Sequence, residues 1–223
     1  MATFQVQVEG MTGVAIDSTP VSTSELTGFL QDGVLEVTRR IITAFPQDAV
    51  HFQRESAEQT SNNSYSIKGD ILSVVRESGT DNDWRNCRYI APSLQSRATD
   101  LNSFHYASKF NPAYTLLDNG KINVFPAAGG NPNAFKVYYV NNDPKRDSDA
   151  AVLEASSSDI RFFPQDRYYL VALYASIKVL EAVMSNWTQE EEDLELTQAT
   201  QLQITSLKQQ YETALVGPPQ QQG

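Results

Sequence analysis

The side chains that could carry out chemistry in this chain are few. His51 and His105 are the only histidines and Cys87 is the only cysteine, so no pair of nitrogen or thiolate ligands stands at a metal-binding spacing. We expect structural histidines, with His105 in an aromatic setting that suits packing, and at Cys87 a small strand residue rather than a reactive thiol. The sequence therefore predicts no metal, no cofactor and no catalytic residue.

Two short segments resemble binding loops only in part. Residues 81–83 read Asp-Asn-Asp, like the start of a calcium loop, but Trp84 and Arg85 stand where the EF-hand pattern needs another oxygen ligand and a glycine. Residues 129–132 read Gly-Gly-Asn-Pro, which is typical of a turn rather than of a phosphate cradle. Neither segment predicts a ligand.

Motifs of the common enzyme classes are missing from the sequence. It has no G-x-S-x-G elbow, no Walker loop and no dinucleotide fingerprint after a strand. Pairs of carboxylates for glycoside chemistry converge only in the fold, so a carboxylate-based hydrolase stays open as a remote alternative. We expect a protein that is not an enzyme.

Charge and hydropathy exclude further classes. The 223 residues carry 17 basic and 27 acidic side chains, a net charge of −10, without the Lys and Arg clusters that tight DNA binding needs. No apolar run approaches the length of about 20 residues that spans a bilayer, and the first residues lack the features of a signal peptide. We expect synthesis in the cytoplasm and no membrane. The acidic run at 190–195 suits a solvated helix start.

Helical signals bracket the chain. Ser22 and Glu25 form a capping box, apolar residues then recur at spacings of three and four, and Pro46 ends the pattern, which predicts a helix over 22–45. Residues 1–20 fit either a strand or a short helix. Near the end, 164–187 is apolar on more than one face and predicts a buried helix, whereas 189–215 has a thin apolar stripe and a glutamine-rich face.

The middle of the chain, 50–140, has the alternation and the turn signals of antiparallel strands. Residues 70–77 predict a buried strand and 84–90 its return strand. Asp-Asn-Gly at 118–120 predicts a tight hairpin between 114–117 and 121–125, and 135–140 is expected to complete a meander. The expected fold is α+β and mainly helical: a bundle of the N-terminal helix and two long C-terminal helices with an inserted antiparallel β meander. It forms one domain over 1–216, followed by a flexible tail at 217–223.

Several segments of the sequence are similar to those of a known family. They are Gly69–Arg76, Cys87–Ser93, Phe104–Pro112, Asn123–Pro126, Lys136–Val140, Phe163-Pro164 and Tyr169–Ser176. With the order of helices and strands, they resemble a family of virion structural proteins of tailed bacteriophages, of the marine and cyanophage type. The resemblance covers most of Thr3 to Trp187.

The resemblance implies a structural role in the virion. Its helices around a β insertion are similar to head-to-tail connectors, or adaptors, which form a homo-oligomeric ring, usually of about twelve copies, beneath the portal. It implies a place in the virion neck, the portal protein and tail or neck proteins as partners, and genomic DNA that passes through the lumen without specific binding. Another neck, tail-completion or tail-tube protein is the alternative.

A ring subunit must bury two different patches against identical neighbours. The helix over 189–215 suits this role, because glutamine amides form hydrogen bonds at an interface without the desolvation of a full charge. The C-terminal tail is expected to extend onto the portal. The predicted assembly interface consists of Leu196, Ala199, Leu202, Gln203, Leu207, Gln210, Tyr211, Pro218, Pro219 and Gln220.

Overall fold

The computed structural model describes residues 2–17, 19–117, 120–189 and 194–216. The chain forms two compact units, which we call the helical unit, Met1–Phe52 with Asp143–Gly223, and the β unit, Gln53–Asn142. The expected single domain over 1–216 stays a prediction, because each unit is described by itself and the tail at 217–223 lies outside the described residues.

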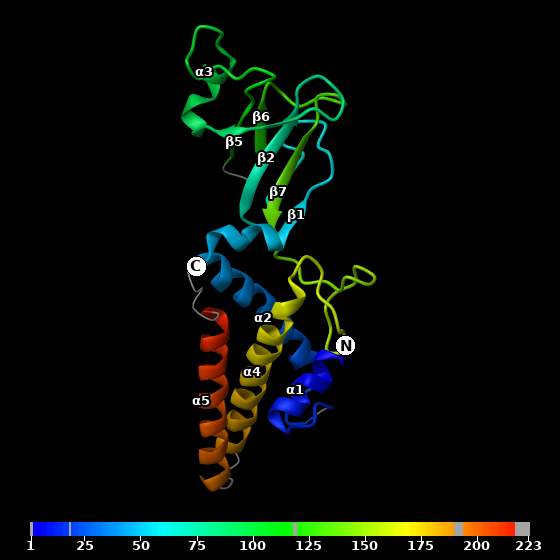
Figure 1. The fold of residues 1–223 in the computed structure, drawn as a ribbon, viewed down its shortest axis with the longest axis vertical. Helices are drawn as coiled ribbons and strands as arrows, with labels where there is room; N and C mark the ends of the chain where they lie inside the picture. Colours follow the sequence, from blue (N-terminus) through cyan, green and yellow to red (C-terminus); the bar gives the residue numbers. More distant parts are fainter. Residues whose placement is uncertain (1, 18, 118–119, 190–193, 217–223) are drawn as a thin grey trace, which may run out of the picture. The chain divides into compact units, whose positions relative to one another are not determined.

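A central helix, α4, organises the helical unit. It contacts α1, α2 and α5, and its buried residues therefore lie on several sides rather than on one stripe (Figure 1). The helices of this unit are α1 (Phe4–Thr12), α2 (Thr23–Ala44), α4 (Tyr168–Gln189) and α5 (Leu194–Val216), with the 3-10 helices η1 (Pro46–Phe52) and η3 (Gln165–Arg167).

The start of α2 is fixed by the predicted capping box. The Ser22 hydroxyl accepts a hydrogen bond from the Glu25 amide at 3.2 Å, and the Glu25 carboxylate accepts one from the Ser22 amide at 2.8 Å. Farther along α2, a Cβ on Gly33 would lie 3.0 Å from the Tyr174 ring of α4, so this glycine permits close helix packing. Gly28 faces open space, and packing does not explain it.

Apolar composition alone would let α4 cross a membrane. Among the described residues, one helical stretch, Gln165–Trp187, is long and apolar enough, with a mean hydropathy of 1.3, and 56% of its most apolar window is buried within the structure. The sequence reading, which found no apolar run of this kind, missed it. Three neighbouring helices account for the apolar composition, as expected for the core helix of a packed unit.

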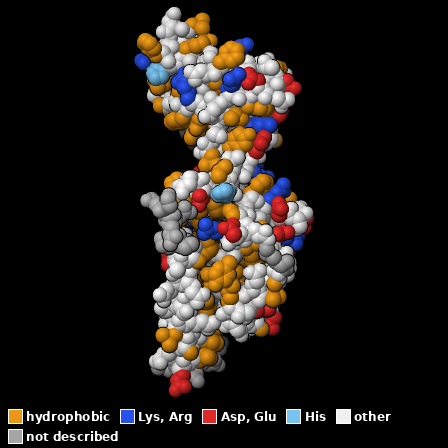
Figure 2. Space-filling view, in the orientation of Figure 1, with side chains coloured by type: hydrophobic (Ala, Val, Ile, Leu, Met, Phe, Trp, Pro, Cys, Tyr) orange, Lys and Arg blue, Asp and Glu red, His pale blue; other side chains and the backbone are white. Residues whose placement is uncertain are grey.

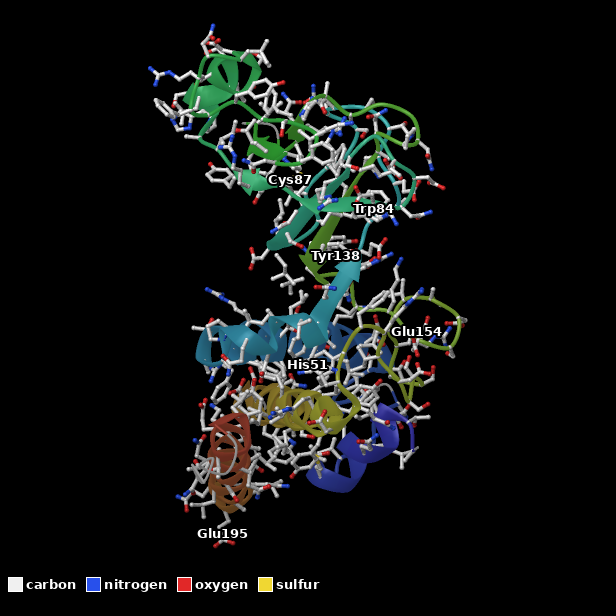
Figure 3. All side chains as sticks on the ribbon, turned by 45° about the horizontal axis from the view of Figure 1, so that its top comes forward. His51, Trp84, Cys87, Tyr138, Glu154 and Glu195 are labelled. Carbon is white, nitrogen blue, oxygen red and sulfur yellow. The ribbon has the colours of Figure 1, made fainter. Side chains whose placement is uncertain are left out.

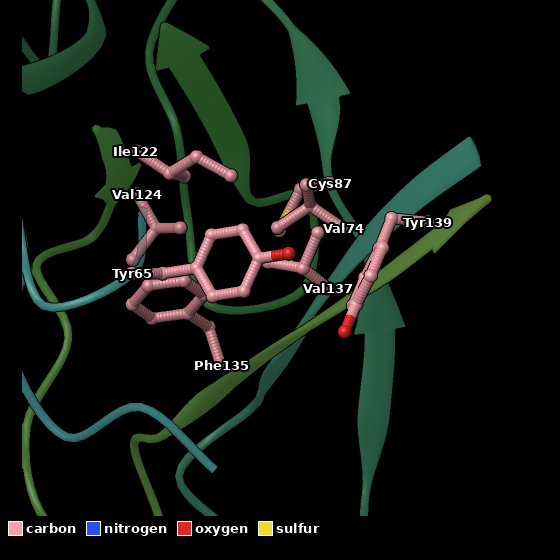
Figure 4. Close-up of a cluster of buried hydrophobic side chains, with 8 residues drawn as sticks. All are labelled: Tyr65, Val74, Cys87, Ile122, Val124, Phe135, Val137 and Tyr139. Atoms are coloured by element: carbon pink, nitrogen blue, oxygen red, sulfur yellow. The ribbon is translucent and has the colours of Figure 1, made fainter. Parts of the chain in front are cut away.

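Two sheets form the β unit. One has the strand order β1-β7-β2-β3 and is antiparallel, and the other has the order β4-β5-β6, in which β4 and β5 run parallel. Their shared core contains Tyr65, Val74, Cys87, Ile122, Val124, Phe135, Val137 and Tyr139 (Figure 4). The elements are β1 (Gln53–Glu55), β2 (Ile71–Glu77), β3 (Trp84–Asn86), β4 (Arg88–Tyr89), η2 (Pro92–Leu94), α3 (Gln95–Thr99), β5 (Ala113–Leu116), β6 (Ile122–Phe125) and β7 (Phe135–Val140).

The expected mainly helical bundle with an inserted meander is wrong: the protein is α+β with two sheets and a separate β core. The strands β5 and β6 pair as predicted, with Leu116 opposite Ile122, whereas residues 118–119 of the predicted tight turn lie outside the described residues. However, β7 does not continue this pair of strands, and instead pairs with β2 and β1. The expected return strand 84–90 also divides at Cys87, because β3 pairs with β2 while β4 joins β5.

Two adjacent buried charged residues explain how the chain changes sheets after β6. Arg76 of β2 donates from Nε to the Pro126 carbonyl at 2.8 Å and from Nη2 to the Ala127 carbonyl at 3.1 Å. The Glu77 carboxylate accepts from the Ala134 amide at 3.1 Å. These bonds hold the loop between β6 and β7 on the first sheet, and thereby direct β7 to β2.

Candidate functional site

The last described helix, α5, has one covered and one open face. Ile204, Leu207 and Tyr211 recur at spacings of three and four and are buried within the helical unit, where α5 contacts α4 and α2. On the opposite side, Leu202 is 72% exposed. Because residues 3–4 apart share a helix face, Leu202, Ser206, Gln209 and Thr213 line this open side; all four are exposed.

The open side of α5 carries one charge, Glu195 in the first turn, and is uncharged beyond it. Among residues 194–216 the charged side chains are Glu195, Lys208 and Glu212. Lys208 and Glu212 lie on the flanks, where Lys208 Nζ is 2.8 Å from Glu181 of α4 and Glu212 pairs with Arg40 of α2. We call the exposed residues Gln198, Ala199, Leu202, Ser206, Gln209 and Thr213 the outward face of α5.

Electrostatics at the covered side fastens α5 to its neighbours. Burial disfavours ionisation of Glu181, but hydrogen bonds from Lys208 and Lys178 outweigh it and lower the pKa of this carboxyl below its usual range. Burial also raises the pKa of Tyr211 to about 12, and its ring lies 6.2 Å from that of Tyr174.

A groove of about 540 Å³ between the ends of α2 and α5 is lined by Arg39, Arg40, Thr43, Phe45, Glu212 and Leu215, among others.

Some residues of the predicted interface are exposed in the structure and others are buried. Leu196, Ala199, Leu202 and Gln210 are exposed on α5. Leu207 and Tyr211 instead belong to the core, with Leu207 only 7% exposed.

Gln203 also serves the unit itself, since it donates to the Met11 carbonyl at 3.0 Å, beside the end of α1. The predicted contacts at Pro218, Pro219 and Gln220 lie outside the described residues. The expectation that this helix packs chiefly against neighbouring subunits therefore applies to its outward face alone.

A pocket of about 660 Å³ in the helical unit brings together His51, Ser158, Asp147, Asp159 and Tyr168 (Figure 3 labels His51). Several of these groups maintain the surrounding loop. The Tyr168 hydroxyl bonds both the amide and the carbonyl of Ile160 at 2.9 Å, and Asp159 accepts from the Asp147 amide at 3.2 Å.

Within the described part of the chain, no hydrogen bond joins His51 to Ser158 or to either aspartate, and no group of His, Cys, Asp and Glu is arranged to hold a metal. The carboxylate-based hydrolase stays a remote alternative.

The β unit uses its other reactive groups structurally. Cys87 is buried in the core, and this burial raises the pKa of its thiol to about 12 (Figure 3). In the loop that resembled a calcium site, Asp83 accepts from Ser78 and Arg85, and Asp81 accepts from Asn131 at 2.8 Å. The Asp83 carboxylate is therefore engaged within its own turn, and the Asp81 carboxylate is engaged by the loop between β6 and β7.

Two features escaped sequence reasoning. Arg76 and Glu77 were predicted only as part of a buried strand. Two opposite charges at the end of a β-branched run could have indicated buried charged side chains. The aromatic segment at 104–107 was expected to suit packing, but the Phe104 side chain projects fully into solvent, with a relative exposure of 106%.

Comparison with known proteins adds no relative: the chain matches no family model and no curated protein.

Proposed function

We propose that this chain is a structural protein of a tailed-bacteriophage virion that assembles as a head-to-tail adaptor ring beneath the portal. The observation that carries the proposal is the outward face of α5, which is uncharged from Gln198 to Thr213 and exposes Leu202. Solvated helix faces are usually rich in charge, whereas the centre of a protein interface is depleted of it. The sequence segments that resemble the phage family agree with this role and with a place in the virion neck.

The chemistry of the face fits a contact between copies of the chain. A helix of 23 residues is about 35 Å long, which suits a standard interface. Glutamine and serine side chains can form hydrogen bonds with a neighbour without the desolvation of an ion, while Leu202 and Ala199 supply apolar area. Since α5 is fastened to α4 and α2 on its other side, it presents this face as a fixed surface.

Charge supports the passage of DNA without binding. The helical unit carries 19 acidic and 8 basic residues, a net of −11 within the chain total of −10. In a ring, such a surface towards the lumen repels the phosphate backbone and keeps the DNA from adhering. The portal protein above and a tail or neck protein below are the proposed partners.

The proposal is tested by imaging the purified chain in negative stain, with and without a portal protein from the same genome. Rings of the chain, alone or on the portal, are expected. Leu202→Glu places a charge on the outward face and should abolish them, whereas Val152→Glu, at an exposed valine of the same unit, should not. Stacked tubes without portal binding would favour a tail-tube protein. A monomer that does not bind the portal protein would refute the adaptor role.

A further inference from the structure

The helical unit contains a pocket of about 660 Å³ that the proposed ring contact on α5 does not use. Its volume lies within the range of pockets that bind small ligands. Its walls come from η1, from the loop between β7 and η3 and from the first turn of α4, and they include His51, Asp147, Asp159, Phe162 and Tyr168. Both sequence segments of the helical unit therefore contribute to this pocket.

Asp147 and Asp159 give the pocket negative charge. The Asp159 carboxylate accepts a hydrogen bond from the Asp147 amide at 3.2 Å, so the two aspartates are neighbours. Burial raises the pKa of the Tyr168 hydroxyl, and the charges of Asp159 and Asp147 raise this pKa further. The hydrogen bond from the Ile160 amide to the same hydroxyl opposes the rise. Both carboxylates therefore lie close enough to Tyr168 to act on one side of the pocket.

The basic side chains around the pocket are engaged by other acids. Three of them form ion pairs outside the lining: Lys145 with Asp143 at 3.1 Å, Arg146 with Asp149 at 2.8 Å and Arg167 with Asp166 at 3.4 Å. Figure 2 shows acidic and basic side chains intermixed on one face of the helical unit. Within the described residues, the lining holds no lysine or arginine, and neither Asp147 nor Asp159 forms an ion pair. Their charge is therefore available to a cation from outside the chain.

Aromatic rings form the apolar wall of the pocket. The Phe163 ring centre lies 6.1 Å from that of Tyr168 and 5.2 Å from that of Phe52, so packing holds this wall in place. Phe162 has a φ of 53°, which is unusual for a bulky residue, and such strained residues cluster at binding sites. The Arg161 guanidinium lies 4.8 Å from the Phe162 ring centre, as expected for a ring that attracts cations.

We infer that this pocket binds an organic cation, a guanidinium or primary ammonium group on an apolar stem. Asp147 and Asp159 would pair with the charged group, while the rings of Phe162 and Tyr168 would cover the stem and one face of the cation. A free amine or guanidine and the lysine or arginine side chain of another protein present the same chemistry. Binding of the cation does not depend on the proposed ring.

An anion is the competing occupant. The pocket lies at the N-terminal end of η3 and α4, where the helix dipole favours negative charge. However, the two carboxylates of the lining repel an anion, and Asp166 already supplies a negative charge in the first turn of η3. The lining therefore favours a cation.

A matched pair of probes tests the inference in NMR titrations of the full chain. Butylguanidinium carries the cation on an apolar stem, whereas butylurea has a similar shape without the charge. Butylguanidinium should bind with a dissociation constant of about 1 mM or below, and butylurea and inorganic phosphate should not bind. Three results would overturn the inference: no binding of butylguanidinium at about 10 mM, equal binding of butylurea, or binding of phosphate alone.

Variants of the lining locate the bound cation. The double variant Asp147→Asn with Asp159→Asn removes both charges and retains an oxygen that accepts from the amide of residue 147. It should weaken the binding of butylguanidinium about tenfold or more. Glu154→Gln is the matched control, because it removes an exposed acid of the same loop outside the lining and should bind as the parent does (Figure 3). Equal affinity of the double variant and the control would overturn the inference.

Phe162→Gly tests the aromatic wall without demanding a new backbone conformation, since glycine adopts a positive φ without strain. Loss of the ring should weaken the binding of butylguanidinium about threefold. Unchanged affinity would contradict the role of this ring in the site.

A capped peptide, acetyl-Gly-Arg-Gly-amide, distinguishes the two sources of the cation. Peptide binding that is lost in the double variant would assign the pocket to an arginine of another protein, and binding of butylguanidinium without the peptide would assign it to a free small molecule. The double variant should still form rings at the parental concentration, so failure of the cation site and failure of the adaptor role are separate results.

Discussion

Replacing Leu202 and Leu207 by alanine, one at a time, separates the open and the covered sides of α5. Leu207 is 7% exposed and packed within the helical unit, so Leu207→Ala should lower the free energy of unfolding by about 3 kcal/mol through lost burial and a residual cavity. For a chain of this size that corresponds to a decrease in Tm of roughly 6–12 °C.

Leu202→Ala should behave oppositely. Leu202 is 72% exposed, so truncation removes only about a quarter of the burial free energy of a leucine, about 0.5 kcal/mol, and Tm should change by less than about 2 °C. If a neighbouring subunit covers this side chain, the remaining burial, about 1.5 kcal/mol, belongs to the contact. Each contact should then weaken about tenfold.

Thermal unfolding and sedimentation velocity at several protein concentrations measure the two effects. We expect Leu207→Ala to lower Tm. We expect Leu202→Ala to weaken assembly while Tm stays unchanged. Leu202→Ala protein that assembles at the same concentration as the parent would refute the assignment of the outward face, and an unchanged Tm for Leu207→Ala would refute the packing of α5.

Three further predictions concern groups that lie within one unit and stabilise it. Lys208→Met should cost about 0.5 kcal/mol at neutral pH, because the pair with Glu181 is partly solvated. Since the folded-state pKa of Glu181 is lowered, this contribution is fully present above the usual pKa of glutamate and is lost as the pH falls through the lowered value, so parent and variant should converge in acid during urea titrations; a difference that persists there would contradict it. Arg76→Met should destabilise the protein by about 3–5 kcal/mol in urea unfolding, because the loop carbonyls of Pro126 and Ala127 lose their donor while Glu77 stays buried; a loss below about 1 kcal/mol would contradict the role of this pair. Cys87 should react with a thiol reagent at pH 8 only after denaturation, since burial raises its pKa to about 12; rapid reaction of the folded protein would contradict its burial.

Local signals in the sequence predicted local structure well. The capping box of Ser22 and Glu25 forms as expected, and the helices expected over 22–45 and 164–187 occur as Thr23–Ala44 and Tyr168–Gln189. The strands β5 and β6 also pair as expected, because side-chain periodicity and helix caps are properties of neighbouring residues.

Pairing between distant segments could not be predicted in the same way. Strand periodicity gives no partner, and β7 joins β2 because Arg76 fixes the loop at Pro126 and Ala127 from a distance of 50 residues along the chain. The stripe on α5 was visible in the sequence. Its burial against α4 was not, so Leu207 and Tyr211 were predicted to contact other subunits, whereas they are buried within the helical unit. The exposure of Phe104 likewise depends on the fold rather than on its neighbours in sequence.

The mass of the assembled protein tests the central claim most directly. Mass photometry of the purified chain, alone and mixed with its portal protein, should show a closed species at a fixed multiple of 24.8 kDa, about 300 kDa for a ring of about twelve copies. The species should disappear with Leu202→Glu and persist with Val152→Glu. A single population at 24.8 kDa that is unchanged by concentration and by portal protein would contradict the account.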